Sequence, residues 1–147
     1  MRKFIQRYSK CFVCGDKNEA GLKIDFFYEN GKAKAEYMPT HKLEGYKDIL
    51  HGGIISSLLD EVMIKAIIAK GIVSLTLRME VKFRNLAKID EKLLLEGWIK
   101  EERRKLLLAE GKACKHDGTL IAEAQGTYYK VKGEMKELLE SCLEMDS

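Results

Sequence analysis

The segment His51-Gly52-Gly53, followed by Asp60 and Glu61, combines residue types that can bind a negatively charged oxygen and supply a reactive carboxylate. Two consecutive glycines let another group approach the backbone closely. They precede a helical pattern, and the unpaired amides of a first helical turn are donors with positive dipole character. An acid further along an apolar helix is costly to bury unless the protein uses it. The pattern therefore predicts an oxygen-binding helix start and a functional acid on one helix.

The helix that must position these groups is predicted from about residue 54, because apolar pairs recur every four residues from there to Ile67. Lys70-Gly71 is expected to end it, since glycine is a common residue just after a helix. Asp60 and Glu61 point about 100° apart on a helix. Only one of the two acids can therefore face a given reacting group.

The remaining segments alternate with the two-residue period of β-strands. Asn30-Gly31 lies between apolar segments 22–27 and 33–38, which predicts a hairpin, and residues 40–50 form the loop that leads to the helix. Four more strands are expected at 75–83, 93–101, 105–115 and 120–131. In the first of these, every second residue from Leu75 to Phe83 is apolar, so one face should be apolar and the other polar.

Two neighbouring predicted strands each carry three successive small residues on one face, which forms a trough for a helix. These residues are Ala109, Gly111 and Ala113 on one strand and Ala122, Ala124 and Gly126 on the other. We therefore predict an α+β fold with an antiparallel sheet of about six strands around one long central helix. A single domain should span 1–147, with a core at about 11–131, a short N-terminal helix or arm at 1–10, and a possible C-terminal helix within 133–147, periodic from 133 to 145.

Composition and charge exclude several functional classes. The chain has 26 Lys and Arg against 23 Asp and Glu, with the basic residues scattered, so nucleic acid is not an expected partner. No apolar run approaches the roughly 20 residues of a membrane span, and residues 1–5 lack the apolar region of a signal peptide. We therefore expect a cytoplasmic protein that does not bind membranes.

Cys11-Phe12-Val13-Cys14 is a Cys-x-x-Cys motif with three possible interpretations. Zinc would need two further ligands, for which Cys114 and His116 are the candidates, and nothing in the sequence brings them to the motif. A redox pair is possible, although the usual strand-then-helix context is missing. A turn with two packed thiols is the favoured interpretation, and no metal or cofactor is expected.

The predicted order of elements, with His51-Gly52-Gly53 and an acid nine residues after the histidine, resembles the hot-dog fold acyl-CoA thioesterases of the phenylacetyl-CoA thioesterase-like branch. The resemblance covers residues 11–131, and it includes Cys11 to Gly15 and Gly45-Tyr46. It implies a hot-dog fold, acyl-CoA as substrate, and a homodimer whose sheets join edge to edge. Two active sites would lie between the helices, and assembly to a tetramer is common in the family.

The resemblance also implies roles for individual residues. Asp60 would be the general base or nucleophile that attacks the thioester carbonyl. The Gly53 amide would bind the thioester oxygen, and Gly52 would shape the turn beside the substrate. His51 would orient the loop or touch the substrate, and Thr76 would help to place water or the acid.

Glu61 is the remaining candidate, as a substrate-binding residue beside Asp60. Gly53 and Asp60 are seven residues apart, which is a rise of about 10 Å along a helix, too far for one thioester. Each site is therefore expected to take its acid from one chain and its amide donor from the partner.

Two features depart from the family pattern. Glu44-Gly45 stands where many relatives have an amide side chain before the histidine, and Leu86 stands in place of a usual proline. The alternative function is an acyl-CoA-binding or sensor protein without catalysis. A DNA-bound regulator is disfavoured because no helix-turn-helix segment accompanies the domain.

Overall fold

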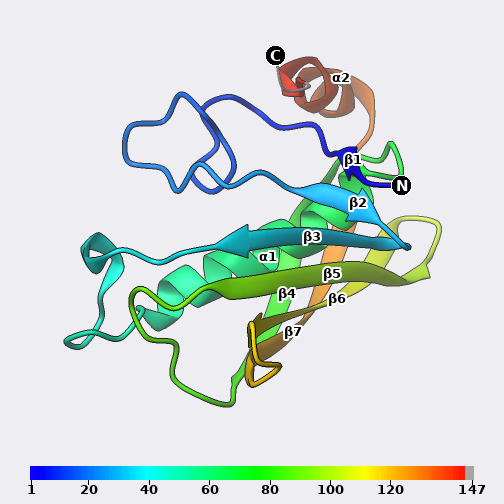
Figure 1. Cartoon of the computed structure of the whole chain (residues 1–147). Helices are drawn as coiled ribbons and strands as arrows, with labels where there is room; N and C mark the ends of the chain where they lie inside the picture. The colour runs from blue at the N-terminus through cyan, green and yellow to red at the C-terminus, as the bar shows by residue number, and fades with distance from the viewer. Residues whose placement is uncertain (145–147) are drawn as a thin grey trace.

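A seven-stranded antiparallel sheet wraps around one long helix in the computed structural model, which describes residues 1–144 (Figure 1). The sheet order is β1-β2-β3-β5-β6-β7-β4, so β4 forms one edge. This architecture confirms the predicted α+β fold, with a seventh strand of only two residues added to the six expected. The elements are β1 (Lys3–Phe4), β2 (Phe27–Glu29), β3 (Lys32–Tyr37), the short 3-10 helix η1 (His41–Leu43), α1 (Gly52–Ile68), β4 (Ser74–Phe83), β5 (Leu93–Glu102), β6 (Leu106–Lys115), β7 (Leu120–Lys130) and α2 (Gly133–Cys142).

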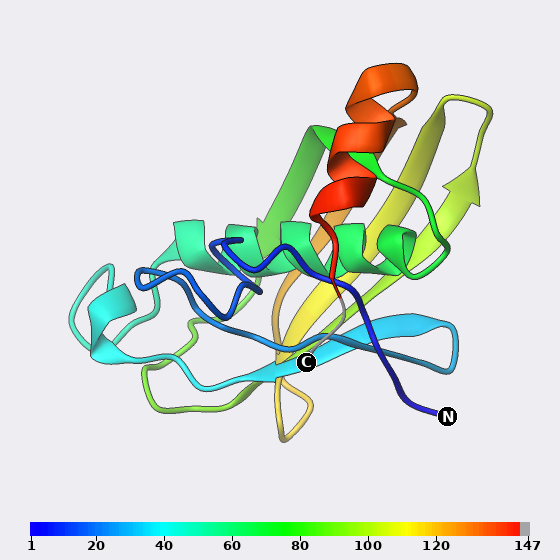
Figure 2. The same cartoon turned by 90° about the horizontal axis from the view of Figure 1, so that it is seen from above.

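Helix α1 crosses one face of the sheet, as Figure 2 shows from above. A Cβ at Gly97 on β5 would lie 2.4 Å from the carbonyl oxygen of Val62, so the helix backbone rests directly on this strand. On β6, a Cβ at Gly111 would approach the Met63 side chain at 3.1 Å. The predicted trough is confirmed, because its small residues on β6 and β7 are cross-strand partners on the helix side of the sheet.

Helix α1 begins two residues earlier than expected, at Gly52, because His51 caps it. The His51 side chain accepts a hydrogen bond from the Gly53 amide, which satisfies one of the donors at the helix start. At the other end the regular helix stops at Ile68, and Gly71 has a φ of 79°, the left-handed conformation that favours glycine. The expected role of Gly71 as a helix terminator is confirmed.

The predicted hairpin is confirmed at its turn, where Asn30 and Gly31 have φ angles of 53° and 77°. Its first strand is shorter than predicted, since residues 22–26 are not part of the sheet. Leu22 donates instead to the carbonyl of Phe12, and Lys23 has a φ of 55°, which interrupts the extended backbone. The chain before β2 therefore packs against the N-terminal loop.

The predicted strict alternation of β4 is wrong at its beginning, because a register shift lies between Thr76 and Arg78. Thr76 pairs with Tyr128, and beyond the shift Met79 pairs with Gly126. Both partners belong to the helix-facing row of β7, so the shift places Thr76 and Met79 on the same face although they are three residues apart. A regular strand would have pointed Thr76 away from α1.

Both termini form short additions to this core. Residues 1–10 form an arm that is not helical, and its Lys3–Phe4 segment pairs with β2. The predicted C-terminal helix is present as α2, which ends at Cys142. Met145, where its periodicity was expected to end, lies outside the described residues. Among residues 1–144, no helix has both the length and the apolar character that crossing a membrane requires.

Candidate active site

The Asp60 carboxylate on α1 is held by two hydroxyl groups from the sheet. Thr76 Oγ1 on β4 and Tyr128 Oη on β7 each donate to Asp60 Oδ1 over 2.9 Å. The two hydroxyl residues are direct cross-strand partners, so both point to the same place on the helix. The structure therefore brings together Asp60 and Thr76, two of the predicted site residues, and adds a tyrosine to them.

The two carboxylate oxygens of Asp60 differ in the hydrogen bonds that they accept. Within residues 1–144 both side-chain hydrogen bonds to this carboxylate fall on Oδ1, and the side chain is half-buried. Tyr128 is fully buried, and burial together with the neighbouring Asp60 carboxylate raises its pKa above the ordinary value of 10.0. The tyrosine is therefore a neutral, permanent donor that fixes Oδ1. Oδ2 is the oxygen that can act on another molecule.

Tyr128 was missed in the sequence, although a signal for it existed. It continues the row of small residues Ala122, Ala124 and Gly126 at two-residue spacing, so it had to face the helix. A Cβ at Gly126 would lie 2.6 Å from the Tyr128 ring, which shows that the ring covers this glycine. Part of the small-residue trough thus accommodates a tyrosine that reaches the helix.

The glycines at the helix start lie at a different place from the acid. Gly53 N donates to His51 Nδ1 over 2.8 Å, and both residues are exposed. A Cβ at Gly52 would lie 3.6 Å from the ring of Phe83, so the helix start packs against the end of β4. The amide predicted to bind a thioester oxygen is therefore capped by His51 within one chain.

Glu61 faces a different side of α1 from Asp60. Cys11 Sγ lies 3.7 Å from its Oε1, and Lys65 Nζ lies 3.9 Å from its Oε2. Burial raises the pKa of Glu61 from 4.5 to about 7, and the neighbouring Cys11 adds to this effect. No hydrogen bond among the described residues joins Glu61 to Asp60 or Thr76, so its expected contact with substrate stays a prediction.

Within residues 1–144, two groups of side chains have the composition of a metal site. Cys11, Cys14 and Glu61 place their sulfur and oxygen atoms within 4.8 Å of one another, and exposed His41, Glu44 and Asp48 form the second group. In the second group Glu44 already accepts a hydrogen bond from the Asp48 amide.

The zinc ligand set considered from the sequence is not assembled. Among residues 1–144, Cys114 and His116 belong to neither metal-like group and instead line a surface hollow with β3 residues.

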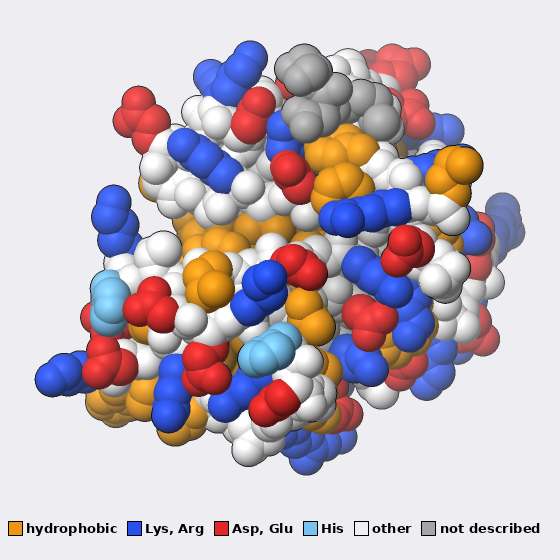
Figure 3. Space-filling model, in the orientation of Figure 1, with side chains coloured by type: hydrophobic (Ala, Val, Ile, Leu, Met, Phe, Trp, Pro, Cys, Tyr) orange, Lys and Arg blue, Asp and Glu red, His pale blue; other side chains and the backbone are white. Residues whose placement is uncertain are grey.

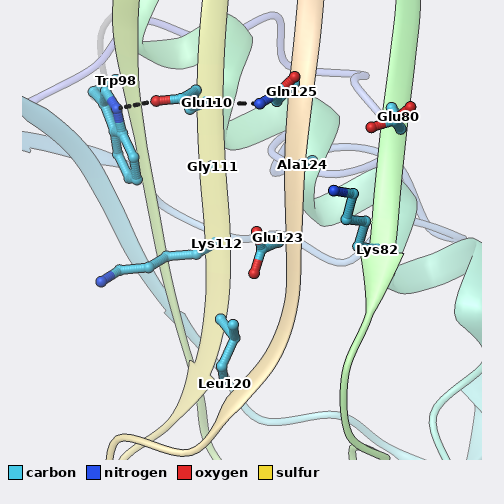
Figure 4. A pocket seen from close by; sticks show the side chains of 10 residues that line it. All are labelled: Glu80, Lys82, Trp98, Glu110, Gly111, Lys112, Leu120, Glu123, Ala124 and Gln125. Atoms are coloured by element: carbon cyan, nitrogen blue, oxygen red, sulfur yellow. Dashed lines mark hydrogen bonds between the residues drawn. The ribbon is translucent and has the colours of Figure 1, made fainter.

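The outer face of the sheet carries a separate hollow of about 200 Å³, away from α1 (Figure 4). Trp98 donates to Glu110, and Gln125 donates to the same carboxylate, so these three of its polar side chains are tied to one another. Figure 3 shows that basic and acidic side chains are interspersed over the surface in the view of Figure 1. This hollow has no counterpart of the Asp60 arrangement, so the helix side of the sheet is the candidate site.

Comparisons with known proteins show which proteins this chain is similar to. A family model described as thioesterase superfamily matches residues 47–122, the segment from before His51 through Asp60 and Thr76 to the start of β7. The human Acyl-coenzyme A thioesterase THEM5 is 24% identical over 117 residues, which is 78% of this chain and 47% of that protein. The chain thus spans about half the length of this curated relative.

Solved structures establish the hot-dog thioesterase fold. The Escherichia coli PaaI protein from the phenylacetic acid degradation operon has a TM-score of 0.70 at 18% identity, covering 76% of this chain and 82% of that chain. A Streptococcus mutans UA159 protein bound to acetyl CoA has a TM-score of 0.69 at 21% identity, covering 74% of this chain and 88% of that chain. At these identities the matches define the fold.

Proposed function

The chain belongs to the thioesterase superfamily, and from this premise we propose that it hydrolyses an acyl-CoA thioester to the free acid and coenzyme A. The observation that carries the proposal is the Asp60 carboxylate, with Oδ1 fixed by Thr76 and Tyr128 over 2.9 Å and Oδ2 left for chemistry. A carboxylate oriented in this way can act as general base on water or attack the carbonyl carbon directly.

In the general-base route, Asp60 Oδ2 takes a proton from a water molecule as that water attacks the thioester carbonyl. In the nucleophilic route, Oδ2 attacks the carbonyl carbon, and water hydrolyses the resulting anhydride. Both routes place negative charge on the carbonyl oxygen and expel the coenzyme A thiolate. The hydroxyl groups of Thr76 and Tyr128 keep the carboxylate in one orientation throughout, which reduces the entropy cost of the attack.

The amide of Gly53 is proposed to bind the carbonyl oxygen as negative charge develops there. Its present acceptor is the exposed His51 ring, so a substrate oxygen has to replace or share that hydrogen bond. Gly52 lies beside Phe83 at this helix start. Because Gly53 and Asp60 are about 10 Å apart along one helix, the amide that serves Asp60 is proposed to come from a second copy of the chain.

The edge strand β4 supports this homodimer. It is ten residues long, and its apolar side chains Leu77 and Phe83 are 60% and 53% exposed. Long edge strands are normally protected, because their free backbone groups invite pairing with another chain. Pairing of two β4 strands would extend both sheets and bring each helix start, which packs on Phe83, toward the partner's Asp60. The full span 1–147 as one domain, a cytoplasmic location and further assembly to a tetramer remain parts of the proposal.

The first experiment is to incubate the purified protein with a panel of acyl-CoA thioesters and a thiol reagent that reports free coenzyme A. We expect turnover of at least one thioester and a loss of about a hundredfold or more in kcat for Asp60→Asn. Glu61→Gln should retain more activity than Asp60→Asn. Binding of acyl-CoA without any release of thiol would instead identify a non-catalytic acyl-CoA-binding protein.

A second experiment tests the shared site. Asp60→Asn subunits are mixed with Gly53→Pro subunits, in which proline removes the amide donor. A mixed dimer then contains one site with an intact acid and an intact amide, so activity should return in folded heterodimers. Folded heterodimers without recovered activity would show that each chain builds its own site.

A further inference from the structure

The turn from Cys11 to Cys14 packs against a side of α1 that the proposed hydrolysis does not use. Cys11 Sγ lies 3.7 Å from Glu61 Oε1, and the two sulfurs and a Glu61 oxygen all lie within 4.8 Å of one another. Cys14 is only 2% exposed, whereas Cys11 is partly exposed. One sulfur is therefore reachable from outside, and the other is reachable mainly from its neighbour.

A buried cation completes this cluster. Lys65 is fully buried, its Nζ lies 3.9 Å from Glu61 Oε2, and it donates to the carbonyl oxygen of Gln6. A buried ammonium group needs a negative partner nearby. Glu61 and Cys11 are acidic groups close to Lys65, and the positive charge of Lys65 would stabilise a thiolate at Cys11 as well as the Glu61 carboxylate.

The backbone of the turn also favours a charged sulfur at Cys11. The Cys14 amide lies 3.4 Å from Cys11 Sγ, and Gly15 N donates to the Cys11 carbonyl over 2.9 Å to close one helical turn. A Cβ at Gly15 would lie 2.5 Å from Cys11 N, so only glycine allows this tight closure. Hydrogen bonding from Cys14 lowers the pKa of Cys11 from 9.0 to about 5, while burial opposes this shift.

We propose that Cys11 and Cys14 form a redox-active dithiol that exchanges with small-molecule disulfides, with Cys11 as attacking sulfur, Cys14 as resolving sulfur and Glu61 as proton carrier. Three observations carry this assignment: Cys11 is partly exposed, Cys14 is buried, and the Glu61 carboxylate lies between them and Lys65. It is independent of the proposed hydrolysis, which uses the other side of the helix.

The exchange proceeds through a mixed disulfide on Cys11. The Cys11 thiolate attacks one sulfur of the disulfide RSSR, a mixed disulfide Cys11–S–S–R forms, and the leaving RS⁻ takes the Glu61 proton to become RSH. The Glu61 carboxylate then takes the Cys14 proton, and the Cys14 thiolate attacks the Cys11 sulfur and expels the second RS⁻. Two electrons pass from the protein thiols to RSSR, and Glu61 ends protonated, as it began, but with the proton that came from Cys14.

Zinc is the competing occupant of the same atoms, and the geometry argues against it. A structural zinc site needs four ligands, and this cluster offers Cys11, Cys14 and Glu61. The ammonium group of Lys65 beside the Glu61 carboxylate repels a further cation.

The test begins with fully reduced protein in glutathione buffers of increasing oxidised fraction, followed by acid quench, alkylation and peptide mass spectrometry. We expect a Cys11–Cys14 disulfide in one cooperative step. Cys114 and Cys142 are built-in controls, since both are partly exposed free thiols outside the cluster. Cys14→Ser should stop at one glutathione on Cys11, and Cys11→Ser should leave Cys14 unmodified.

Thiol reactivity provides a second readout. At pH 6 the fraction present as thiolate is about three hundred times larger for a thiol with a pKa of about 5 than for a free cysteine with a pKa of about 8.5. Lower nucleophilicity offsets most of this, so iodoacetamide should modify Cys11 about fivefold faster than Cys142.

Glu61→Gln tests the proton carrier. The titratable and charged groups that interact electrostatically with the Glu61 carboxylate are Cys11 and Cys14 from the N-terminal turn, Asp60 and Lys65 from α1, and Tyr128 from β7. Closure of the mixed disulfide should slow by about a hundredfold in Glu61→Gln and lose its inflection near pH 7. An effect on folding alone would not move this pH profile.

Three results would overturn the proposal. Cys11 and Cys14 could stay reduced at every glutathione ratio while Cys142 reacts, which would make them packed thiols. Stoichiometric zinc in the purified protein that blocks alkylation of both sulfurs would identify a metal site. Glutathione on Cys11 in the unmodified chain with no closure by Cys14 would exclude a resolving partner.

Discussion

Gly97→Ala is expected to weaken hydrolysis without altering any group that touches substrate. A Cβ at this position would lie 2.4 Å from the carbonyl oxygen of Val62 and 3.0 Å from the amide of Met63. The first distance is about 1 Å short of the 3.4 Å at which ordinary contact begins. Since these are backbone atoms of α1 that cannot rotate away, the helix has to move off the sheet.

The size of the effect follows from where Asp60 lies. It precedes Val62 by two residues, and its 2.9 Å hydrogen bonds to Thr76 and Tyr128 tie this turn of α1 to the sheet. Overpacking of a core costs about 1–3 kcal/mol of unfolding free energy, which lowers Tm by about 3–10 °C in a chain of this size. A displacement of about 1 Å at a reacting group costs about a hundredfold in rate, so kcat should fall by about tenfold to a hundredfold.

Gly111→Ala is the matched control, because Gly111 is the cross-strand partner of Gly97. Its new Cβ would lie 3.1 Å from Met63 Cγ and 3.3 Å from the carbonyl oxygen of Glu96, so shifts of a few tenths of an ångström are enough to accommodate it. Thermal unfolding and acyl-CoA hydrolysis should be measured for both variants. We expect the decrease in Tm and kcat mainly in Gly97→Ala. Equal Tm and kcat for Gly97→Ala and the unmodified chain would refute the direct seating of α1 on β5, as would an equally large loss in Gly111→Ala.

Tyr128→Phe removes one of the two donors to Asp60 Oδ1. It should lower kcat about tenfold in steady-state kinetics and the unfolding free energy by about 1–2 kcal/mol in urea titration. An unchanged kcat would mean that this hydroxyl does not orient the acid. Burial raises the pKa of Glu61 from 4.5 to about 7, so the folded chain holds more protons than the unfolded chain between these pH values, and stability from this group falls as pH rises through that window. As pH rises from 4.5 to 7, the unfolding free energy of the unmodified chain should therefore fall by about 2–3 kcal/mol relative to that of Glu61→Gln. Urea titrations at several pH values check this, and parallel curves of unfolding free energy against pH for the two chains would contradict it. Leu77→Lys on the β4 edge should raise the dimer dissociation constant measured by sedimentation at least about tenfold. Leu138 on α2 is similarly exposed, and Leu138→Lys should leave dimerisation unchanged. An equal effect of both substitutions would show that β4 does not form the interface.

Features that depend on near neighbours in the chain could be predicted from the sequence. Helix α1 follows from apolar residues repeated every four positions, and its end follows from Gly71, whereas its start was placed two residues too late because the cap by His51 was not foreseen. The β2–β3 turn follows from the positive φ angles that Asn30-Gly31 adopts readily. Chain order and periodicity were also sufficient for the α+β architecture, whereas the choice of Asp60 over Glu61 as the candidate acid came from the resemblance to a known family.

Contacts between distant residues were decided only by the path of the folded chain. Tyr128 reaches Asp60 across 68 positions, and Cys11 reaches Glu61 across 50. The register shift next to Thr76 belongs to the pairing of β4 with β7, so strand alternation alone assigned Thr76 to the wrong face. Local sequence restricts backbone angles and periodicity, but the partner of a buried hydroxyl, carboxylate or thiol is set by how the helix and the strands pack together.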